Sequence, residues 1–218
     1  MTTKASEIID RLEEKLNDLG NVRWTVEELI RSINDGQKMI LEADPSLFEY
    51  FDSVPVQQGS RQQVPDDCYL LFDVEELNLS GVFVSTPRKI KKSVMDRQIP
   101  GWIGAASGDR IDHWCQEQSE TNYFFINPPV TPASHTLRLR YAKYPDPVTS
   151  GTDDLSVQDE SINGLYYFCM MRCLEKDEKF AGSAQSARFA QMFVGTFGAR
   201  SQGDTATYIQ RAKEEDVE

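Results

Sequence analysis

The stretch from Trp24 to Pro45 carries signals for the start, the buried face and the end of one helix. Thr25 is placed to accept a hydrogen bond from the Glu28 amide, and the Glu28 carboxylate to accept one from the Thr25 amide, which predicts a capping box. Pro45 ends the helix, because the residue before a proline is disfavoured in the α region. One face is expected to be buried, formed by Val26, Leu29, Ile30, Ile33, Ile40 and Leu41, and the opposite face exposed, formed by Glu27, Arg31, Asn34, Asp35 and Lys38.

Gly36 lies inside this expected helix, where a glycine costs up to about 1 kcal/mol relative to alanine. A close packing partner at Gly36 would explain that cost. The sequence therefore predicts that another element approaches the helix at this point.

Further helices are expected on both sides of the chain. Residues 3–19 have an apolar stripe and are followed by Gly20, which suits a left-handed helix end. Residues 159–180 also have helical spacing, and Gly182 is expected to end that helix before Ser183 caps the next one. The last helix has an aromatic stripe that is typical of a core or a subunit interface, formed by Phe189, Met192, Phe193 and Phe197.

The middle of the chain has mixed signals near its start. Val54 and Val56 alternate before a turn at Gly59-Ser60, which is typical of an edge strand. A short helix is expected from Pro65, and residues 69–72 also fit a strand. The inward-facing residues of that short helix are expected to be Cys68, Leu71 and Val74.

Three later segments favour strands, over residues 81–84, 123–126 and 135–144. The last of them alternates apolar and polar residues, so one of its faces is expected to be covered. A proline-containing loop joins the last two, and we expect them to be antiparallel neighbours.

These elements predict an α+β protein. Its main part is a helical bundle made by the N-terminal and C-terminal helices, with a small antiparallel β-rich part in the middle. The expected boundaries are residues 1–47 and 155–198 for the bundle, 48–154 for a β-rich insertion with short helices, and 199–218 for a polar tail that is mobile unless a partner holds it.

Composition restricts the function. The 218 residues include 23 basic and 35 acidic side chains, a net charge of -12, whereas a free nucleic-acid binder is normally basic. No apolar run approaches the roughly 20 residues that a membrane span needs, and the N-terminus lacks the apolar centre of a signal peptide, so we expect a cytoplasmic location. The four cysteines are then expected to be reduced, and Cys169 and Cys173 to lie on a buried helix face.

Two segments have charged residues that could form a site. The chain has one basic cluster, which either meets an acidic surface or forms a solvated helix face; it comprises Arg88, Lys89, Lys91, Lys92 and Arg97. The tryptophan of the IPGWI turn after it, Trp102, is expected to anchor a loop. Asp109, Asp112 and His113 follow in a polar loop that has too few ligand types to favour a metal site over surface residues.

Motifs of known chemistry are missing from the chain. It contains no GxxxxGK[ST], GxGxxG, HExxH, GxSxG or paired CxxC sequence. We therefore assign no catalytic residue, no cofactor and no metal, and expect a protein that is not an enzyme.

The order of several short motifs resembles the head-to-tail adaptor (connector) proteins of short-tailed bacteriophages. These motifs are a WTxxEL-type helix containing NDGQ (residues 24–37), a Gln-rich extended segment (57–65), IPGW (99–102), YFFINPP (123–129), a strand ending in YxxxPxPV (141–148) and terminal helices (159–198). The sequence departs from the family pattern at Gln158, where proline is common before the long helix, and after Gly198.

This resemblance implies a ring, usually of about twelve copies, beneath the portal protein of the virion neck. The ring would join the capsid to the tail tube or nozzle protein, and genomic DNA would pass through it without specific binding. The protein would be made in the cytoplasm of the host bacterium. Candidate interface residues are Arg88, Lys89, Lys91, Lys92, Arg97, Phe189, Phe193, Phe197, Arg200, Tyr208 and Arg211.

Two hypotheses and two alternatives follow. About twelve copies would carry a charge of roughly −140, so an acidic channel would repel DNA and let it slide. Residues 199–218 would become ordered only against a portal or a neighbouring subunit. The alternatives are another neck or tail component, such as a head-completion or tail-terminator protein, and a small metal-dependent hydrolytic enzyme that uses the Asp109–His113 loop.

Overall fold

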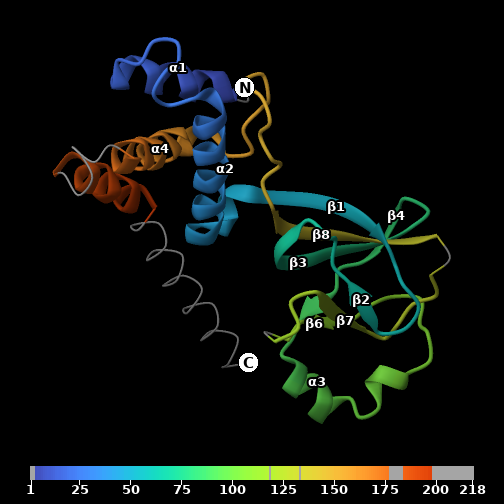
Figure 1. The fold of residues 1–218 in the computed structure, drawn as a ribbon. Helices are drawn as coiled ribbons and strands as arrows, with labels where there is room; N and C mark the ends of the chain where they lie inside the picture. The colour runs from blue at the N-terminus through green and yellow to red at the C-terminus, as the bar shows by residue number, and fades with distance from the viewer. Residues whose placement is uncertain (1–2, 118, 133, 177–183, 198–218) are drawn as a thin grey trace. The chain divides into compact units, whose positions relative to one another are not determined.

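The computed structural model describes residues 3–117, 119–132, 134–176 and 184–197. The chain divides into two units: Met1–Phe48 with Tyr144–Glu218, which is helical, and Glu49–Lys143, which contains the strands (Figure 1). The α+β class predicted from the sequence is therefore confirmed, and residues 144–154 fall with the helices. Among the described residues, no helix has the length and apolar character needed to cross a membrane.

The second helix, α2 (Val26–Ala43), begins at its predicted capping box. The Glu28 amide donates to Thr25 Oγ1 at 3.3 Å, and the Thr25 amide donates to Glu28 Oε2 at 3.1 Å. Four of the predicted core residues are buried, namely Leu29, Ile33, Ile40 and Leu41. Val26 is predicted on the same face but is exposed, in the first turn of the helix.

The first helix, α1 (Ala5–Leu16), is shorter at both ends than predicted. Asn17 ends it, with a left-handed φ of 53°, and not Gly20 as expected. Asparagine tolerates this conformation because its short side chain bonds locally, so the helix ends before the glycine is reached. The short η1 helix (Pro45–Phe48) follows α2.

The NDGQ part of α2 is where the rest of the helical unit packs. Asn34 was expected to point away, but its Nδ2 donates to the Val148 carbonyl and its Oδ1 accepts the Val148 amide, both at 2.8 Å. Gln37 Oε1 accepts the Ser156 amide at 2.8 Å. These bonds hold the segment that returns from the strands against α2.

Gly36 has the close neighbour that the sequence predicted. A Cβ atom at this position would lie 2.5 Å from Leu165 Cδ1 and 3.0 Å from Phe168 Cδ1. Both residues belong to α4 (Ile162–Lys176), which follows the short η3 helix (Asp159–Ser161). The predicted end of that helix and its Gly182 and Ser183 lie outside the described residues, and a further helix covers residues 184–197.

The strand unit contains two sheets. The first has the order β1-β8-β3-β4 and consists of β1 (Glu49–Pro55), β8 (His135–Lys143), β3 (Cys68–Leu79) and β4 (Val82–Ser85). In β8 the predicted alternation is confirmed, because Leu137, Leu139 and Tyr141 are fully buried. The edge strand predicted around Val54 is β1.

The short helix predicted from Pro65 is wrong, because β3 occupies that sequence. Leu71, Val74 and Leu77 are buried and lie three residues apart, opposite Tyr141, Leu139 and Leu137 of β8, which lie two apart. Register shifts between these pairs add one residue to each repeat of β3, as β-bulges do. A strand with a bulge in each repeat thus has the three-residue spacing that suggested a helix.

The second sheet has the order β2-β7-β6-β5. Its strands are β2 (Arg61–Gln63), β7 (Tyr123–Asn127), β6 (His113–Cys115) and β5 (Arg88–Lys89). The prediction that 123–126 and 135–144 are neighbours is wrong: β7 pairs with β2 and β6, and β8 pairs with β1 and β3. The seven-residue connection crosses between the two sheets, whose apolar side chains share one core.

A smaller core lies beside the second sheet, where α3 (Lys92–Gln98) and η2 (Trp102–Gly104) follow β5. Trp102 is buried, lies edge-on to the Phe125 ring and donates from Nε1 to Asp96 Oδ1 at 2.8 Å. The prediction that Trp102 anchors its loop is confirmed.

Candidate functional site

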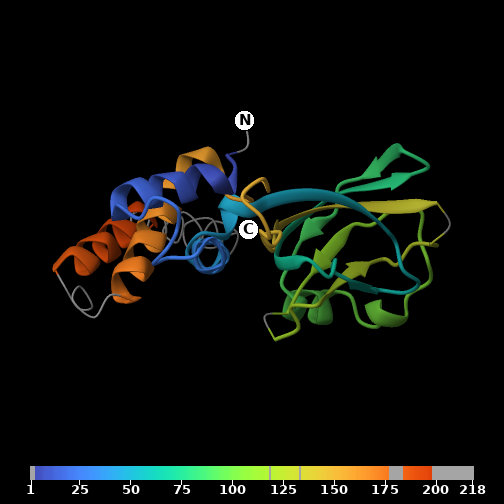
Figure 2. The same ribbon diagram turned by 45° about the horizontal axis from the view of Figure 1, so that its top comes forward.

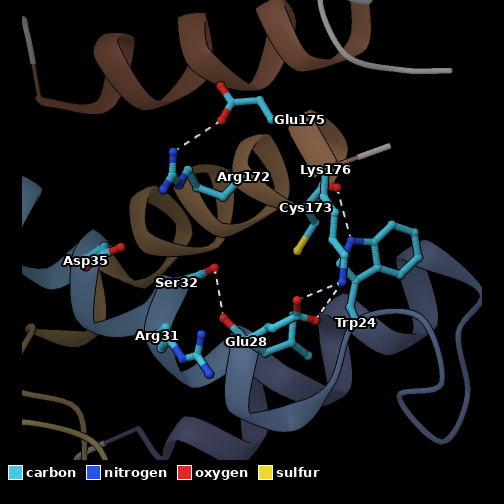
Figure 3. Close-up of a pocket in the computed structure, with 10 residues that line it drawn as sticks. Trp24, Glu28, Arg31, Ser32, Asp35, Arg172, Cys173, Glu175 and Lys176 are labelled. Atoms are coloured by element: carbon cyan, nitrogen blue, oxygen red, sulfur yellow. Dashed lines mark hydrogen bonds and ion pairs between the residues drawn. The ribbon is translucent and has the colours of Figure 1, made fainter. Parts of the chain in front are cut away.

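One hollow of the helical unit, about 410 Å³, lies between the start of α2 and the end of α4 (Figure 3). Trp24 closes one side and donates from Nε1 to the Cys173 carbonyl at 3.1 Å. Lys176 Nζ donates to both Glu28 oxygens at 2.8 and 2.7 Å and to the Arg23 carbonyl at 2.8 Å. The hydrogen bond from Lys176 lowers the pKa of Glu28.

The polar groups of this hollow therefore bond mainly to each other. Arg172 Nη1 lies 3.4 Å from Glu175 Oε2, and Ser32 Oγ donates to the Glu28 carbonyl at 3.1 Å (Figure 3). The Glu28 carboxylate already serves the helix cap and Lys176. This arrangement joins α2 to α4, and it presents no activated nucleophile or paired acid and base.

The four cysteines are free thiols in the structure. Burial raises the pKa of Cys68 and of Cys173 to about 12 and that of Cys115 to about 11, and it raises the pKa of Cys169 well above its ordinary value. Thiols of this kind stay protonated near neutral pH, whereas nucleophiles and metal ligands are thiolates. The prediction that Cys169 and Cys173 are buried on a helix is confirmed.

A second hollow of the helical unit, about 580 Å³, has mainly apolar and aromatic walls. They come from the end of α1, from α4 and from the helix over 184–197. Phe189 of this last helix lies 6.4 Å from the Tyr166 ring and 6.2 Å from the Tyr167 ring, measured between centroids. Lys15 and Arg188 add positive charge to the walls.

The predicted aromatic stripe packs on α4. Phe193 lies 5.6 Å from the Phe168 ring and 5.1 Å from the Phe197 ring. Phe197 is 2% exposed, and a Cβ at Gly164 would lie 2.4 Å from its ring. Within one chain, Phe197 therefore serves the core, while Phe189 and Phe193 keep part of their surface accessible.

The basic cluster comes from β5, from the link after it and from α3. Lys92 Nζ lies 3.3 Å from Glu117 Oε1 and 3.4 Å from Asp96 Oδ2, and the hydrogen bond to Glu117 raises the pKa of Lys92. Lys89 Nζ donates to the Phe72 carbonyl at 3.4 Å and lies 4.7 Å from the Trp114 ring centroid. The exposed members are Arg88, Lys89, Lys91 and Arg97.

The loop considered for a metal is partly a strand. His113 is the first residue of β6, so it belongs to the second sheet. Asp112 forms an ion pair with Arg110, with 2.9 Å between Asp112 Oδ1 and Arg110 Nε. In the part of the chain that the structure describes, no three His, Cys, Asp or Glu side chains gather where they could hold a metal. Of the other candidate interface residues, Arg200, Tyr208 and Arg211 lie outside the described residues, as does the tail over 199–218.

The sequence reading missed exposed apolar side chains on the two edge strands of the first sheet. Val82 and Phe83 of β4 are 67% and 58% exposed, and Tyr50 and Phe51 of β1 are also exposed. The uncharged run Gly81–Val84 predicted a strand, but a strand prediction does not say which strand lies at an edge.

Comparisons with known proteins add one finding. A family model described as SU10 adaptor protein matches residues 3–213. No curated protein matches the chain.

Proposed function

The chain belongs to the SU10 adaptor protein family, and from this membership we propose that it is the structural head-to-tail adaptor of a bacteriophage. Membership confirms the resemblance to head-to-tail adaptors seen in the sequence. The observation that carries the proposal is the extent of the match, which spans nearly the whole chain and both of its units.

In the proposed role, about twelve copies form a ring beneath the portal in the virion neck. The ring joins the portal to a tail tube or nozzle protein and leaves a channel for genomic DNA. The net charge of -12 per chain supports passage without specific binding, since a negative channel wall repels phosphates. The role needs no catalysis, and the protonated thiols and internally paired charges of the first hollow support a structural protein.

The exposed basic residues are the proposed contact with an acidic partner surface. Arg88 and Arg97 are exposed members of the one basic cluster in an acidic chain. The second hollow, with the half-buried Phe189 on its wall, is the proposed apolar contact of the helical unit. Residues 199–218 remain a proposed contact with the portal or a neighbouring subunit.

A binding experiment with the purified portal protein of the same phage tests this function. Electron microscopy of the mixture should show a closed ring of this chain on one end of the portal, with one copy per symmetric position. A protein that binds only the free end of the tail, or only the capsid shell, would instead be another neck or tail component. A protein that ignores both portal and tail would refute the proposal.

Charge reversal of two exposed arginines then tests the contact surface. Arg88→Glu with Arg97→Glu should weaken portal or tail binding at least about tenfold if close charge pairs form there. The matched control is Arg31→Glu with Lys38→Glu, which makes the same charge change on the exposed face of α2. Equal binding by both double variants would remove the basic cluster from the interface and leave the adaptor role untouched.

A further inference from the structure

The first sheet has two open edges, of which the β4 edge lacks the usual protection, whereas the β1 strand contains Glu49, Asp52 and Pro55. β4 lies at one edge and β1 at the other, and no further strand of the described chain pairs with either outer side. Soluble proteins commonly protect an open edge with charges, proline or a covering loop, because unpaired backbone groups there recruit other strands. β4 (Val-Phe-Val-Ser) has no charge and no proline, and the hairpin that carries it projects from the sheet (Figure 2).

Exposed apolar side chains accompany the open backbone at both edges. Val82 and Phe83 lie on β4, Leu79 lies across the hairpin turn on β3, and Tyr50 and Phe51 lie on β1. The Ser53 amide of β1 donates to the carboxylate of Asp52 at 2.7 Å, so this one backbone donor is already used within the chain. Both edges offer apolar surface to an added strand, and the uncharged β4 is the more open of the two.

The directions of the strands decide which partner fits. All three neighbouring pairs of this sheet are antiparallel, so β1 and β4 run in opposite directions. A copy of the chain that is displaced sideways with a small rotation keeps its β1 antiparallel to β4 of the first copy. The antiparallel order of strands then continues from one copy into the next. Such a contact is head-to-tail, and it closes into a ring when the rotation between neighbouring copies divides a full turn.

We propose that β4 of one copy pairs with β1 of the next, so that the first sheets of neighbouring subunits form one continuous antiparallel belt. This inference rests on the proposed ring and names the surface that closes it. The partner is a second copy of this chain, engaged through backbone hydrogen bonds and through the exposed side chains Val82, Phe83, Tyr50 and Phe51.

Charge favours the same pairing. In an antiparallel pair the end of β4 lies beside the start of β1. Arg88 and Lys89 follow β4 after two intervening residues, and β1 begins at Glu49 and contains Asp52 but no basic residue. Basic residues of one copy would therefore approach the acidic edge strand of the next, whereas a second β4 in that place would offer them no acidic residue.

The first test is the assembly state of the full chain by native mass spectrometry and electron microscopy over a concentration series. Val82→Glu with Phe83→Glu places two negative charges on the β4 edge at exposed positions, so each subunit should stay folded, as circular dichroism can check. The concentration needed for ring assembly should rise at least about tenfold, because these carboxylates would face Glu49 and Asp52 of the next copy's β1 and like charges across a strand pair repel. The matched control, Leu19→Glu with Val22→Glu, changes two exposed apolar residues of the helical unit in the same way and should assemble like the wild type.

Cysteine cross-linking tests the geometry. Phe83→Cys and Ser53→Cys chains, mixed and oxidised, should form cross-linked pairs of one chain of each kind, above the background of the wild-type cysteines. Cross-links between two Phe83→Cys chains would mean that β4 pairs with β4, which overturns the continuous belt. Rings of Val82→Glu/Phe83→Glu that assemble like the wild type also overturn it and leave the adaptor role standing. A wild-type chain that stays monomeric at every concentration and ignores the portal overturns both.

Discussion

The contact between α2 and α4 at Gly36 allows one prediction to be worked out in detail. Gly36→Ala adds a Cβ atom 2.5 Å from Leu165 Cδ1 and 3.0 Å from Phe168 Cδ1. Carbon atoms in contact prefer about 3.5–4.0 Å, so Leu165 would have to move by about 1 Å. Leu165 is fully buried and Phe168 is buried, so neither can move without disturbing its neighbours.

Two opposing effects set the size of the change. Overpacking a core costs typically about 1–3 kcal/mol. Alanine favours a helix over glycine by up to about 1 kcal/mol, which offsets part of that cost. The expected result for Gly36→Ala is a net loss of about 1–2 kcal/mol in the free energy of unfolding.

Gly195→Ala is the matched control, because Gly195 lies in the helix over 184–197 and its Cβ would meet nothing within 4 Å. It should gain about 0.5–1 kcal/mol. Urea unfolding of both variants, monitored by far-ultraviolet circular dichroism, gives the free energy of unfolding of each. The preference of alanine over glycine in a helix is common to both variants, so the difference between them measures the cost of overpacking at Gly36. If Gly36→Ala is as stable as Gly195→Ala, the close approach of α4 to α2 is wrong.

Three smaller predictions concern the cap, a turn and the thiols. Thr25→Ala should lower the free energy of unfolding by about 1 kcal/mol, because it removes the hydroxyl that accepts the Glu28 amide; urea unfolding measures this. The Asp153 carboxylate accepts the Thr149 amide at 2.8 Å, and this bond holds the pKa of Asp153 far below its usual range. The stabilisation that the ionised Asp153 carboxylate provides is therefore present above its unfolded pKa of about 4 and is lost as pH falls toward the folded pKa. Asp153→Asn should therefore make the free energy of unfolding depend less on pH on the acid side. Cys68 is the least buried thiol, so Cys68→Ser should remove the fastest reaction of the folded protein with a thiol reagent.

Each of these has a control and a contrary outcome. Thr121→Ala changes an exposed loop threonine, and a loss equal to that of Thr25→Ala would argue against the cap. An Asp153 carboxyl that titrates by nuclear magnetic resonance at its ordinary pKa would contradict the turn. Rapid reaction of Cys169 in the folded chain would contradict its burial.

The sequence predicted the candidate surfaces only in part. It identified the basic cluster, and Arg88 and Arg97 are exposed, but it could not foresee that Lys92 is engaged by Glu117, which lies 25 positions away in the chain. It identified the aromatic stripe, but whether Phe197 faces α4 or solvent depends on Gly164, which leaves room for its ring. It missed the open edges, since exposure at an edge is a property of the order of strands in a sheet.

The features that could be predicted from the sequence alone are those set by chemistry within a few residues. The start of α2 depends on Thr25 and Glu28, its end on Pro45, and the covered face of β8 on a two-residue alternation. The α+β class and the adaptor family were also readable, because they depend on the order of such local signals along the chain.

Tertiary structure decided what the local pattern left open. The spacing of Leu71, Val74 and Leu77 fits a helix, and only pairing with β8 makes it a strand, because each bulge places one residue outside the ladder. Proximity in sequence predicted that β7 and β8 pair, but they lie in different sheets, which pack against each other through one shared core. Local periodicity specifies which side chains must be buried, and the partners that bury them are chosen by contacts between distant parts of the chain.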